Sequence, residues 1–543
     1  MKKFNMTRIA AVCLLAGGVN SVVAAEPAKI SSEDLLNILI QEGVVDEKKV
    51  NEVVKKAQEK TRQQYQSGVE SVPAGKADTR PEQDGAVVRV PYVPQYIQDD
   101  IRDKVRTELR EEVVADVMKK AETERWGIPG TAPDWTQRIK FSGDVRLRAE
   151  SIMFADGNEQ LFYPDYMKIN KSQKETGQYD RLNVTEDRER LRSRFRFGMK
   201  AKVTQGVEAG VRLATGISSN PVSTNETLGD YGKSFDVQMD RGYLKYNSHA
   251  EDVALIGGRF ENPFYRTDLI WDNDLQFDGI AGSWYWMRST SWDSDDRQWD
   301  PYFTLGLFPV DEFELSGDDK WLLGAQTGFT YQSWSQNEWR FGLGYYQYEN
   351  MPGVRNEPNR NDFDYTAPDF IQKGNTYYNI SNVEPYSPEN RLYALAYDYS
   401  IVDVLMEYDI AAFSPHHVIL TAEYIQNIAG DRAEAEALVG EPVDVEGFDG
   451  FLLKATFGWP IVAKPDDWQV AVTYRSLGAN AVVDGFADSD FHTGGTDGRG
   501  YIIEGSYGLF LETWMTVKWM SSDQIDLPTL GVDILQVDIN ARF

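Results

Sequence analysis

From residue 137 to the carboxyl terminus, apolar and polar side chains alternate with a period of two, a pattern that few folds accommodate over such a length. The pattern is clearest in the segment 190–203, where apolar and basic side chains alternate. Leu191, Phe195, Phe197, Met199, Ala201 and Val203 alternate with Arg190, Arg192, Arg194, Arg196, Lys200 and Lys202. Because successive side chains of a β-strand point to opposite faces, this segment predicts a strand with one apolar and one cationic face.

Similar runs of about ten residues recur along this part of the chain. We count seventeen candidate strands: 139–148, 190–203, 206–216, 238–247, 252–260, 277–287, 299–309, 321–334, 338–349, 390–401, 403–414, 416–427, 450–460, 467–478, 499–508, 511–520 and 533–543. Ten residues at ~3.4 Å per residue, tilted by ~45°, span ~24 Å, which matches the apolar band of a membrane barrel.

A soluble β-sandwich would show the same alternation, so the placement of tryptophan separates the two folds. Nine tryptophans lie in or beside the candidate strands, several near strand ends: Trp284, Trp286, Trp321, Trp334, Trp339, Trp459, Trp468, Trp514 and Trp519. Aromatic residues in such positions form the belts of membrane barrels. We therefore predict an all-β transmembrane barrel over residues 137–543. Single-chain bacterial barrels close with an even number of strands, so we expect sixteen or eighteen antiparallel strands and one excess candidate.

The amino terminus has the features of a secretory signal peptide over residues 1–25. Lys2, Lys3 and Arg8 precede a mostly apolar run, and small residues offer a cleavage site after Ala25. Cys13 is the only cysteine and lies within this segment, so the mature chain has neither a disulfide nor a cysteine metal site. The sequence predicts export.

Between the signal peptide and the barrel, the pattern is helical. Residues 26–65 predict a helical hairpin, 66–95 a linker rich in Gly, Pro and Ser, and 96–126 an amphipathic helix. The apolar residues of the helix 96–126 repeat every four positions, so their stripe drifts around the helix and makes a poor long coiled-coil seam. Two interpretations stay open, a solvated helix or a periplasmic element for self-association or docking through residues 31–125.

Composition and motifs exclude several classes of function. The chain carries 85 Asp and Glu against 56 Lys and Arg, a net charge of -29, whereas nucleic-acid binding needs a surplus of basic residues. Mean hydropathy is -0.48, and after residue 25 no apolar run approaches the ~20 residues of a spanning helix. The four histidines, His249, His416, His417 and His492, lack zinc-ligand spacing. We expect no enzyme, no cofactor, no metal and no nucleic-acid partner.

The last strand carries the most specific single signal. Leu535, Val537, Ile539 and Ala541 alternate with polar residues, and the chain stops on Phe543. Together with the segments 132–150 (APDWTQRIKFSGDVRLRAE) and 257–279 (GGRFENPFYRTDLIWDNDLQFDG), this ending resembles the Gram-negative outer-membrane family of putative porins. The resemblance covers residues 97–543, and the helical segment 31–65 lies outside the common porin plan.

The resemblance implies a location in the outer membrane, contact with outer-membrane lipid and lipopolysaccharide, and small hydrophilic solutes as passengers. Phe543 then belongs to the signal that the barrel assembly machinery reads. Many porins are homotrimers, but the resemblance leaves the oligomeric state open.

If the apolar faces meet lipid, the alternate basic side chains must line the lumen, because Arg or Lys on the lipid face costs ~2–4 kcal/mol at mid-depth. We call these residues the basic ladder: Lys140, Arg146, Arg148, Arg190, Arg192, Arg194, Arg196, Lys200 and Lys202. A row of fixed cations favours anions. The alternative is that acids from an opposite wall or an inserted loop balance the ladder.

Two long polar insertions, 150–189 and 350–389, are expected to be extracellular loops, and the segment 261–276 is a candidate for a constriction. Its neighbouring carboxylates Asp272, Asp274 and Asp278 could hold a hard cation. Turn chemistry is the favoured explanation, because the spacing lacks the glycine and closing glutamate of a Ca²⁺ loop.

The sequence predicts an outer-membrane porin for passive diffusion of small hydrophilic solutes. One form of this prediction is a porin that prefers anions. Two alternatives stay open: a specific channel for phosphate or another oxyanion, and a structural or adhesive surface barrel anchored through its helical amino-terminal region.

Overall fold

In the computed structural model of the protein, the described residues are 138–174, 180–286, 298–314, 316–333, 335–382, 390–443, 445, 447–526 and 528–543. The chain divides into two units at Gln137 and Arg138, which coincides with the change of sequence period. The predicted signal peptide, helical hairpin, linker and amphipathic helix lie outside the described residues, and so does Trp334.

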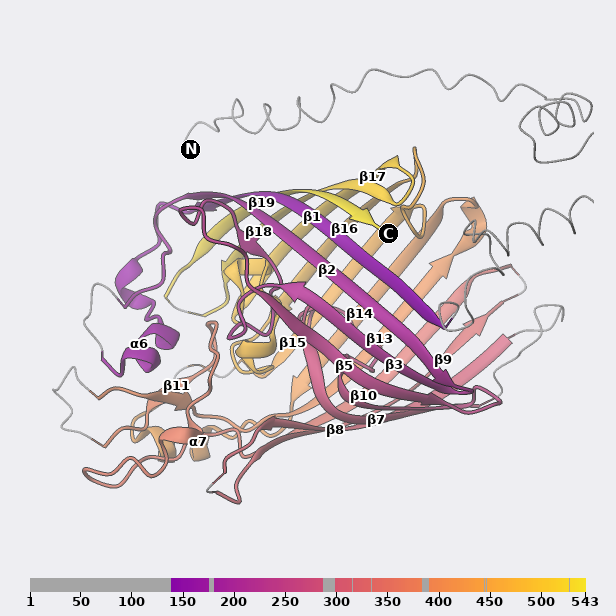
Figure 1. Ribbon diagram of the computed structural model, residues 1–543. Coiled ribbons are helices and arrows are strands. Elements are labelled where there is room, and N and C mark those ends of the chain that lie inside the picture. The colour runs from indigo at the N-terminus through magenta and orange to yellow at the C-terminus, as the bar shows by residue number, and fades with distance from the viewer. Residues whose placement is uncertain are drawn as a thin grey trace, which may run out of the picture. The chain divides into compact units, whose positions relative to one another are not determined.

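Sixteen long antiparallel strands form one closed sheet within the described residues (Figure 1). They are β1 (Ile139–Phe154), β2 (Arg188–Thr204), β3 (Val207–Thr215), β5 (Val237–Asn247), β6 (Val253–Glu261), β7 (Gln276–Tyr285), β8 (Gln298–Asp311), β9 (Lys320–Gln332), β10 (Glu338–Glu349), β13 (Ser400–Ile410), β14 (His417–Asn427), β15 (Asp449–Gly458), β16 (Trp468–Leu477), β17 (Gly498–Phe510), β18 (Thr513–Gln524) and β19 (Gly531–Arg542). Each strand pairs with the next along the chain, and β19 pairs with β1 to close the barrel.

The shorter elements belong to the connections. They are the helices α6 (Tyr166–Ser172) and α7 (Arg432–Val439), the strands β4 (Glu226–Thr227), β11 (Tyr377–Asn379) and β12 (Tyr393–Leu395), and the 3₁₀ turns η1 (Gln160–Phe162), η2 (Asp364–Thr366), η3 (Ala411–Phe413), η4 (Asp484–Phe486) and η5 (Phe491–Thr493). β4 pairs with β2, and β11 pairs with β12. Within the described residues, no helix is both long and apolar enough to cross a membrane.

The even count of sixteen is confirmed, and the excess candidate is the segment 390–401. Within it, β12 pairs with β11 rather than with a barrel strand, and only the last two residues, Ser400 and Ile401, belong to a barrel strand, β13. The apolar side chains of this segment, including Leu392, Leu395 and Tyr397, are buried in a core. The prediction was wrong there because alternation alone does not distinguish a strand against lipid from a segment buried inside the protein.

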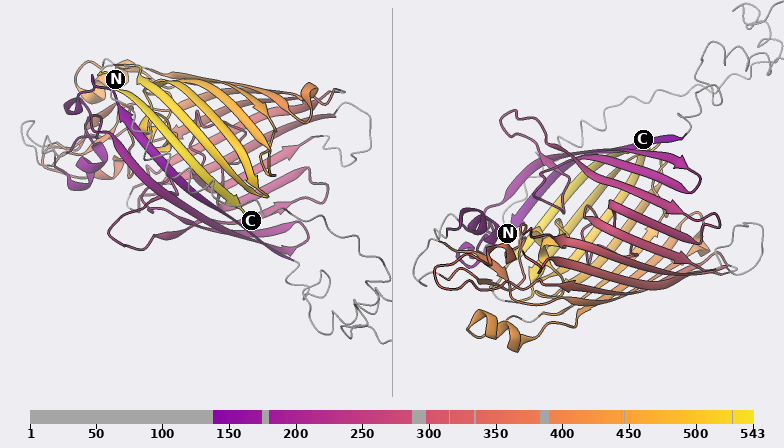
Figure 2. Two further views of the ribbon diagram at one scale, coloured as in Figure 1. Left: turned by 90° about the horizontal axis from the view of Figure 1, so that it is seen from above. Right: turned by 60° about the horizontal axis from the view of Figure 1, so that its bottom comes forward.

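The two faces of the wall differ as the alternation predicts. Apolar side chains such as Leu191 (50% exposed) and Ile280 (60% exposed) stand on the outer face, while their neighbours Arg192 and Ala281 lie on the inner face. The wall is one layer of tilted strands in both views of Figure 2. Short turns join the strands at one end, and long connections gather with α6, α7 and β11 at the other (Figure 1).

Aromatic side chains cluster at the short-turn end of the wall. Trp299 stacks on Phe329 with ring centroids 4.3 Å apart, and Trp339 stacks on Tyr408 at 3.9 Å. Trp468 packs against Phe457 at 5.3 Å on the next hairpin. All of these residues lie close to a strand end, as the predicted aromatic belt requires.

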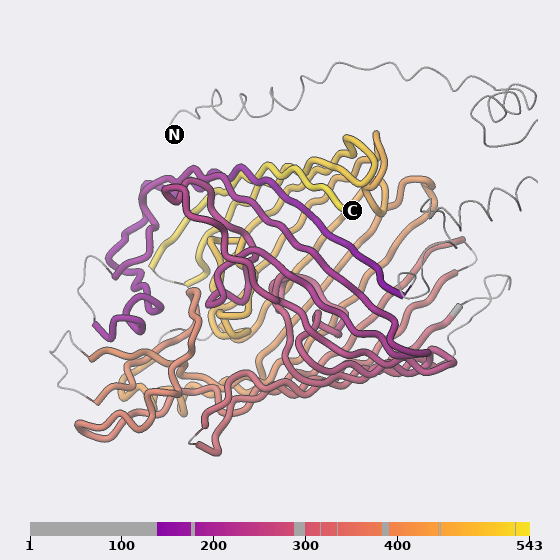
Figure 3. Tube along the Cα trace, viewed as in Figure 1, coloured from indigo at the N-terminus to yellow at the C-terminus, as the bar shows by residue number. Residues whose placement is uncertain are grey.

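Three long connections turn into the barrel at the other end and build a core there (Figure 3). They join β6 to β7 (262–275), β10 to β13 (350–399) and β16 to β17 (478–497). Their apolar side chains pack against inward residues of the wall; members include Phe260, Leu269, Ile270, Trp271, Tyr346, Ile380, Tyr397 and Val482. This packing positions the charged residues of the connections against the wall.

Candidate functional site: a charged network on the inner wall

The basic ladder lies on two neighbouring strands and one face of the wall. β1 and β2 pair antiparallel, so ladder residues of the two strands are directly opposite one another. The opposed pairs are Lys140–Lys200, Asp144–Arg196, Arg146–Arg194, Arg148–Arg192 and Glu150–Arg190. Like charges in directly opposite positions destabilise a sheet, so the two Arg–Arg pairs need carboxylates nearby.

Carboxylates of the wall supply part of that compensation. Glu150 accepts two hydrogen bonds from the Arg190 guanidinium, at 2.7 and 3.1 Å. Asp538 on β19 does the same for Arg148, at 2.8 and 2.9 Å. Both contacts are bidentate, the arrangement in which a guanidinium binds a carboxylate most strongly.

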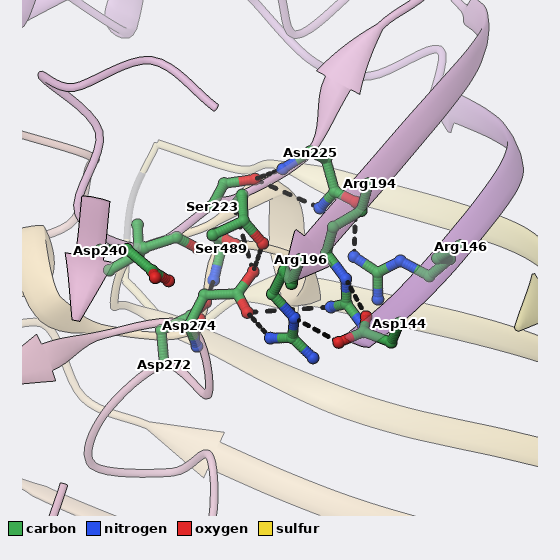
Figure 4. A network of polar contacts seen from close by, with 12 residues as sticks. Asp144, Arg146, Arg194, Arg196, Ser223, Asn225, Asp240, Asp272, Asp274 and Ser489 are labelled. Atoms are coloured by element: carbon green, nitrogen blue, oxygen red, sulfur yellow. Dashed lines mark hydrogen bonds and ion pairs between the residues drawn. The ribbon is translucent and has the colours of Figure 1, made fainter. Parts of the chain in front are cut away.

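Asp144 on β1 binds two arginines of β2. It accepts a hydrogen bond from Arg194 at 2.8 Å and another from Arg196 at 2.8 Å. In Figure 4 these two arginines lie between Asp144 on one side and Asp274 on the other.

The inward connections supply the remaining carboxylates. Asp274, in the connection between β6 and β7, accepts a hydrogen bond from Arg196 at 3.1 Å and lies 3.8 Å from Arg194. Its second oxygen accepts hydrogen bonds from the backbone N–H and the hydroxyl of Thr224. Asp490, in the connection between β16 and β17, is paired with Arg148 at 2.8 Å.

Both connection carboxylates are ionised at neutral pH. Burial by itself raises the pKa of Asp274, but Arg194 and Arg196 outweigh burial and hold the pKa below its ordinary value. Burial also raises the pKa of Asp490, and Arg148, Lys518 and Arg146 together hold it far below the usual range. Each carboxylate therefore brings a full negative charge to the ladder.

Positive and negative charge nearly balance within this network. The six arginines are Arg146, Arg148, Arg190, Arg192, Arg194 and Arg196, and the five carboxylates that contact them are Asp144, Glu150, Asp274, Asp490 and Asp538. Six positive charges against five negative ones leave a small positive excess.

The lysines of the ladder lie toward the short-turn end and are exposed. Lys140, Lys200 and Lys202 have no ion-pair partner among the residues that the structure describes. Their positive charges are therefore less closely balanced by carboxylates than those of the arginines.

The wall farthest from the ladder carries carboxylates. Around the closed ring, β10 and β13 lie eight strands from β1 and β2, respectively. The inner face there bears the acids Glu338, Asp403, Glu407, Asp409 and Glu423, of which Glu338 and Glu407 pair with Arg340 and Asp409 contacts His417. The interior therefore has a basic side and an acidic side.

The connection between β6 and β7 spans the two sides. Near its start, the hydroxyl and backbone N–H of Thr267 donate hydrogen bonds to Glu423 on the acidic wall. Near its end, Asp274 binds Arg196 on the basic wall. Leu269, Ile270 and Trp271 between these contacts are fully buried. The predicted constriction segment 261–276 thus crosses the interior of the barrel.

The three carboxylates considered for a cation site are not brought together. Asp272 accepts hydrogen bonds from the backbone N–H groups of Asp274 and Ser489, and Asp274 binds Arg196. Asp278 lies on the outer face of β7, in the same row as Ile280, and pairs with Arg259 on β6. Within the described ranges, no three His, Cys, Asp or Glu side chains are grouped to hold a metal ion.

Two cavities flank the middle of the ladder. One of about 240 Å³ is lined by Asp144, Arg196, Lys200, Arg212 and Arg241, toward the short-turn end. The other, of about 440 Å³, is lined by Arg192, Ser223, Asn225 and Glu226 at the end with long connections. Arg146, Arg194 and Asp274 line neither cavity and belong to the contact network drawn in Figure 4.

Sequence reasoning named Asp274 and the alternative of acids from an inserted loop, but it missed Asp144, Glu150, Asp490 and Asp538, although two of these could have been found. Asp144 and Glu150 occupy the same alternate positions of β1 as Arg146 and Arg148, and this phase marks them as inward neighbours. Asp490 has no such signal, because it lies in a long connection 342 residues from Arg148 in sequence.

Phe543 lies where the barrel closes. Its backbone N–H donates to the carbonyl of Gly143 at 3.0 Å, and its own carbonyl accepts from Gly143 N–H at 2.8 Å. The aromatic side chain is 62% exposed on the outer side. The terminal residue thus continues the β1–β19 pairing by one step.

Comparison with solved structures finds outer-membrane channels at low identity. OprB of Pseudomonas putida at high pH has a TM-score of 0.43 and 11% identity, over 77% of this chain and 97% of that one. DcaP of Acinetobacter baumannii has a TM-score of 0.38 and 10% identity, over 75% and 97%. OmpF of Salmonella typhi in complex with daunomycin has a TM-score of 0.39 and 9% identity, over 75% and 97%. These values are too low to transfer a solute or an assembly state.

No curated protein matches this chain. A protein-family model does match, and it covers residues 29–543, nearly the whole sequence. The match includes all sixteen strands and the charged network that they carry. The chain therefore belongs to the family described as "Putative porin".

Proposed function

We propose that the protein is an outer-membrane porin through which small hydrophilic solutes diffuse passively. The observation that carries the proposal is the sidedness of a closed wall, with exposed apolar side chains outside and a charged network inside. The row of charged side chains has a polar cavity at each end. These side chains can replace part of the hydration shell of a solute that passes through the barrel.

The solute path runs beside the ladder rather than through the middle of the barrel. The apolar core of the three inward connections packs against β6 to β10 and β13 to β16. Of the two polar cavities, the smaller lies against β1, β2, β3 and β5, and the larger lies against β2 and β4. This division favours a narrow path between the basic wall and the crossing connection.

The near balance of charge favours a modest preference for anions over a strong one. The network carries six positive and five negative charges, and the lysines of the ladder add positive charge at the short-turn end. In a wet path, ions screen this excess over ~8 Å at physiological salt.

The same proposal includes the export of the chain, its membrane contacts and its assembly into the outer membrane. The signal peptide directs export and is removed by cleavage after Ala25. The apolar wall contacts outer-membrane lipid and lipopolysaccharide, and the assembly machinery reads the strand that ends in Phe543. The proposal also includes a homotrimer and a periplasmic contact through residues 31–125.

Ion permeability in planar bilayers tests the proposal. The purified full-length protein is expected to conduct, with a reversal potential in a KCl gradient that shows a weak anion preference. Replacing Arg192, Arg194 and Arg196 with Gln is expected to move the Cl⁻/K⁺ permeability ratio toward cations by at least about twofold, equal to ~0.4 kcal/mol.

Arg360→Gln is the matched control, because Arg360 is exposed and lies in the connection between β10 and β13. This variant is expected to keep the wild-type ratio. Folded protein that passes no current would contradict the proposal and favour a structural or adhesive surface barrel.

A further inference from the structure

Two arginines of the ladder retain guanidinium N–H groups that no protein atom binds. The Nε atoms of Arg146 and Arg192 are buried and have no hydrogen-bond partner. Unpartnered buried donors are uncommon in proteins and cost about 1–3 kcal/mol each. These two guanidinium groups are therefore less completely paired by protein atoms than those of Arg148 and Arg190.

The carboxylates around these arginines are engaged elsewhere. The carboxylate nearest to Arg146 is Asp538 at 4.0 Å, and Asp538 forms its two short hydrogen bonds with Arg148. The carboxylate nearest to Arg192 is Glu150 at 3.9 Å, and Glu150 is bidentate with Arg190. The positive excess of the network therefore resides at Arg146 and Arg192.

Neutral polar groups connect these two arginines. Arg146 donates to the side-chain oxygen of Asn225 at 2.5 Å, and Arg192 donates to the hydroxyl of Ser223 at 3.2 Å. The Asn225 amide also donates to Ser223 at 3.3 Å. Arg192, Ser223 and Asn225 all line the 440 Å³ cavity, so this cluster borders open space (Figure 4 shows Arg146, Ser223 and Asn225).

We infer that Arg146, Arg192, Ser223 and Asn225 form a binding site for the oxyanion group of a small solute, a carboxylate or a phosphate. Guanidinium groups present forked N–H donors that match the oxygen pairs of such groups. The cavity holds far more than one oxyanion group, so the rest of the solute has room beside it. The inference rests on the proposed function, since the site lies on the path of the proposed channel.

One acidic residue limits how tightly the site can hold an anion. Glu226 lines the same cavity, and one of its carboxylate oxygens is buried without a hydrogen-bond partner. Its charge opposes the bound oxyanion and keeps binding weak enough for release, as conduction requires.

Current through the full-length protein in planar bilayers tests the site, with inorganic phosphate as one probe and acetate as another against a chloride background. Current carried by an oxyanion that binds is expected to saturate with its concentration. Arg192→Gln and Arg146→Gln are each expected to raise the half-saturating concentration about tenfold or more, since a hydrogen bond to a charged group is lost. Glu226→Gln is expected to lower it.

Lys200→Gln is the matched control, because it removes the same charge from the same strand at the other end of the ladder. It is expected to change the reversal potential and to leave the half-saturating concentration within about twofold. If an arginine variant does not fold, the Ser223→Ala and Asn225→Ala double variant provides the same comparison with a smaller increase.

Saturation with phosphate, with acetate or with both supports the site and identifies its oxyanion. Linear currents for both probes from a conducting wild-type protein would overturn the inference and leave the porin function intact. Equal effects of Arg192→Gln and Lys200→Gln on half-saturation would also overturn it, because general electrostatics would then explain both. Absence of all current would contradict the porin function itself.

Discussion

Asp274 joins the crossing connection to the inner network. It binds Arg196, lies near Arg194, and accepts two hydrogen bonds from Thr224. Removing its charge leaves both arginines with Asp144 as their shared carboxylate. We therefore expect Asp274→Asn to increase the Cl⁻/K⁺ permeability ratio by about twofold or more and to weaken the tether of the crossing connection by about 1.5–3 kcal/mol.

Asp278→Asn provides the control at this scale. It is the same substitution four residues away, but Asp278 lies on the outer face beside Arg259. Reversal potentials of the two folded variants are the measurement, and the Asp278 variant is expected to match the wild type. An equal shift in both variants would show that Asp274 does not act inside the path.

At the scale of the element, two inward connections meet at a buried carboxyl group. Asp484 lies in the connection between β16 and β17, and its side chain accepts a hydrogen bond from Tyr377 of β11 at 2.6 Å. Its second oxygen is buried without a partner. Burial raises the pKa of Asp484 to about 6, although Tyr377 and nearby backbone N–H groups act in the opposite direction.

This raised pKa makes the contact depend on pH. The folded protein holds the Asp484 proton more tightly than the unfolded chain does, so its contribution to stability is present below about pH 4 and is lost as the pH rises to about 6. Asp484→Asn should remove this dependence and stabilise the contact at pH 7 by at most about 3 kcal/mol. Hydrogen exchange of peptides covering 372–380 and 480–488, at pH 4.5 and pH 7, measures the change.

Asp362→Asn, an exposed carboxylate in the connection between β10 and β13, is the control for this experiment. It should keep the wild-type pH dependence. The measured quantity is protection relative to the intrinsic exchange rate, which itself rises with pH. Protection in the Asp484 variant that still falls between pH 4.5 and pH 7 as in the wild type would assign the dependence to another group.

At the scale of the whole molecule, closure of the barrel depends on a glycine. A Cβ atom at Gly143 would lie 2.8 Å from the backbone oxygen of Arg196 and 2.5 Å from the Phe543 ring. Backbone cannot move aside cheaply there, because Gly143 lies between β2 and the last residue of the chain. We expect Gly143→Ala to lower the folded fraction and to destabilise the barrel by about 1–3 kcal/mol.

Gly505→Ala on β17 is the matched control, because a Cβ atom at Gly505 meets nothing within 4 Å. Heat-modifiable migration of refolded protein in gels and urea titration measure both variants. Equal folding of the two variants would mean that the β1–β19 junction accommodates a larger side chain than its geometry indicates.

The sequence by itself determined the faces of the wall, the last strand that ends in Phe543 and the row of basic residues on two segments. It could do so because the strand period is local, so that each residue's face follows from its neighbours two positions away. The in-phase acids Asp144 and Glu150 were equally readable from β1. The excess strand at 390–401 shows where this local rule ends, since a buried segment has the same alternation.

Only the tertiary structure decided which charges meet. Asp274 and Asp490 reach the ladder because apolar residues such as Trp271 and Phe491 pack inside the barrel and hold long connections in place. These contacts join residues far apart in sequence, and no period records them. The inward folding of those connections decides whether the row of arginines is a bare cationic track or a nearly neutral network in which Arg146 and Arg192 each keep one unpartnered N–H group. The reason is that electrostatic balance is set by distance in space rather than by position in the chain.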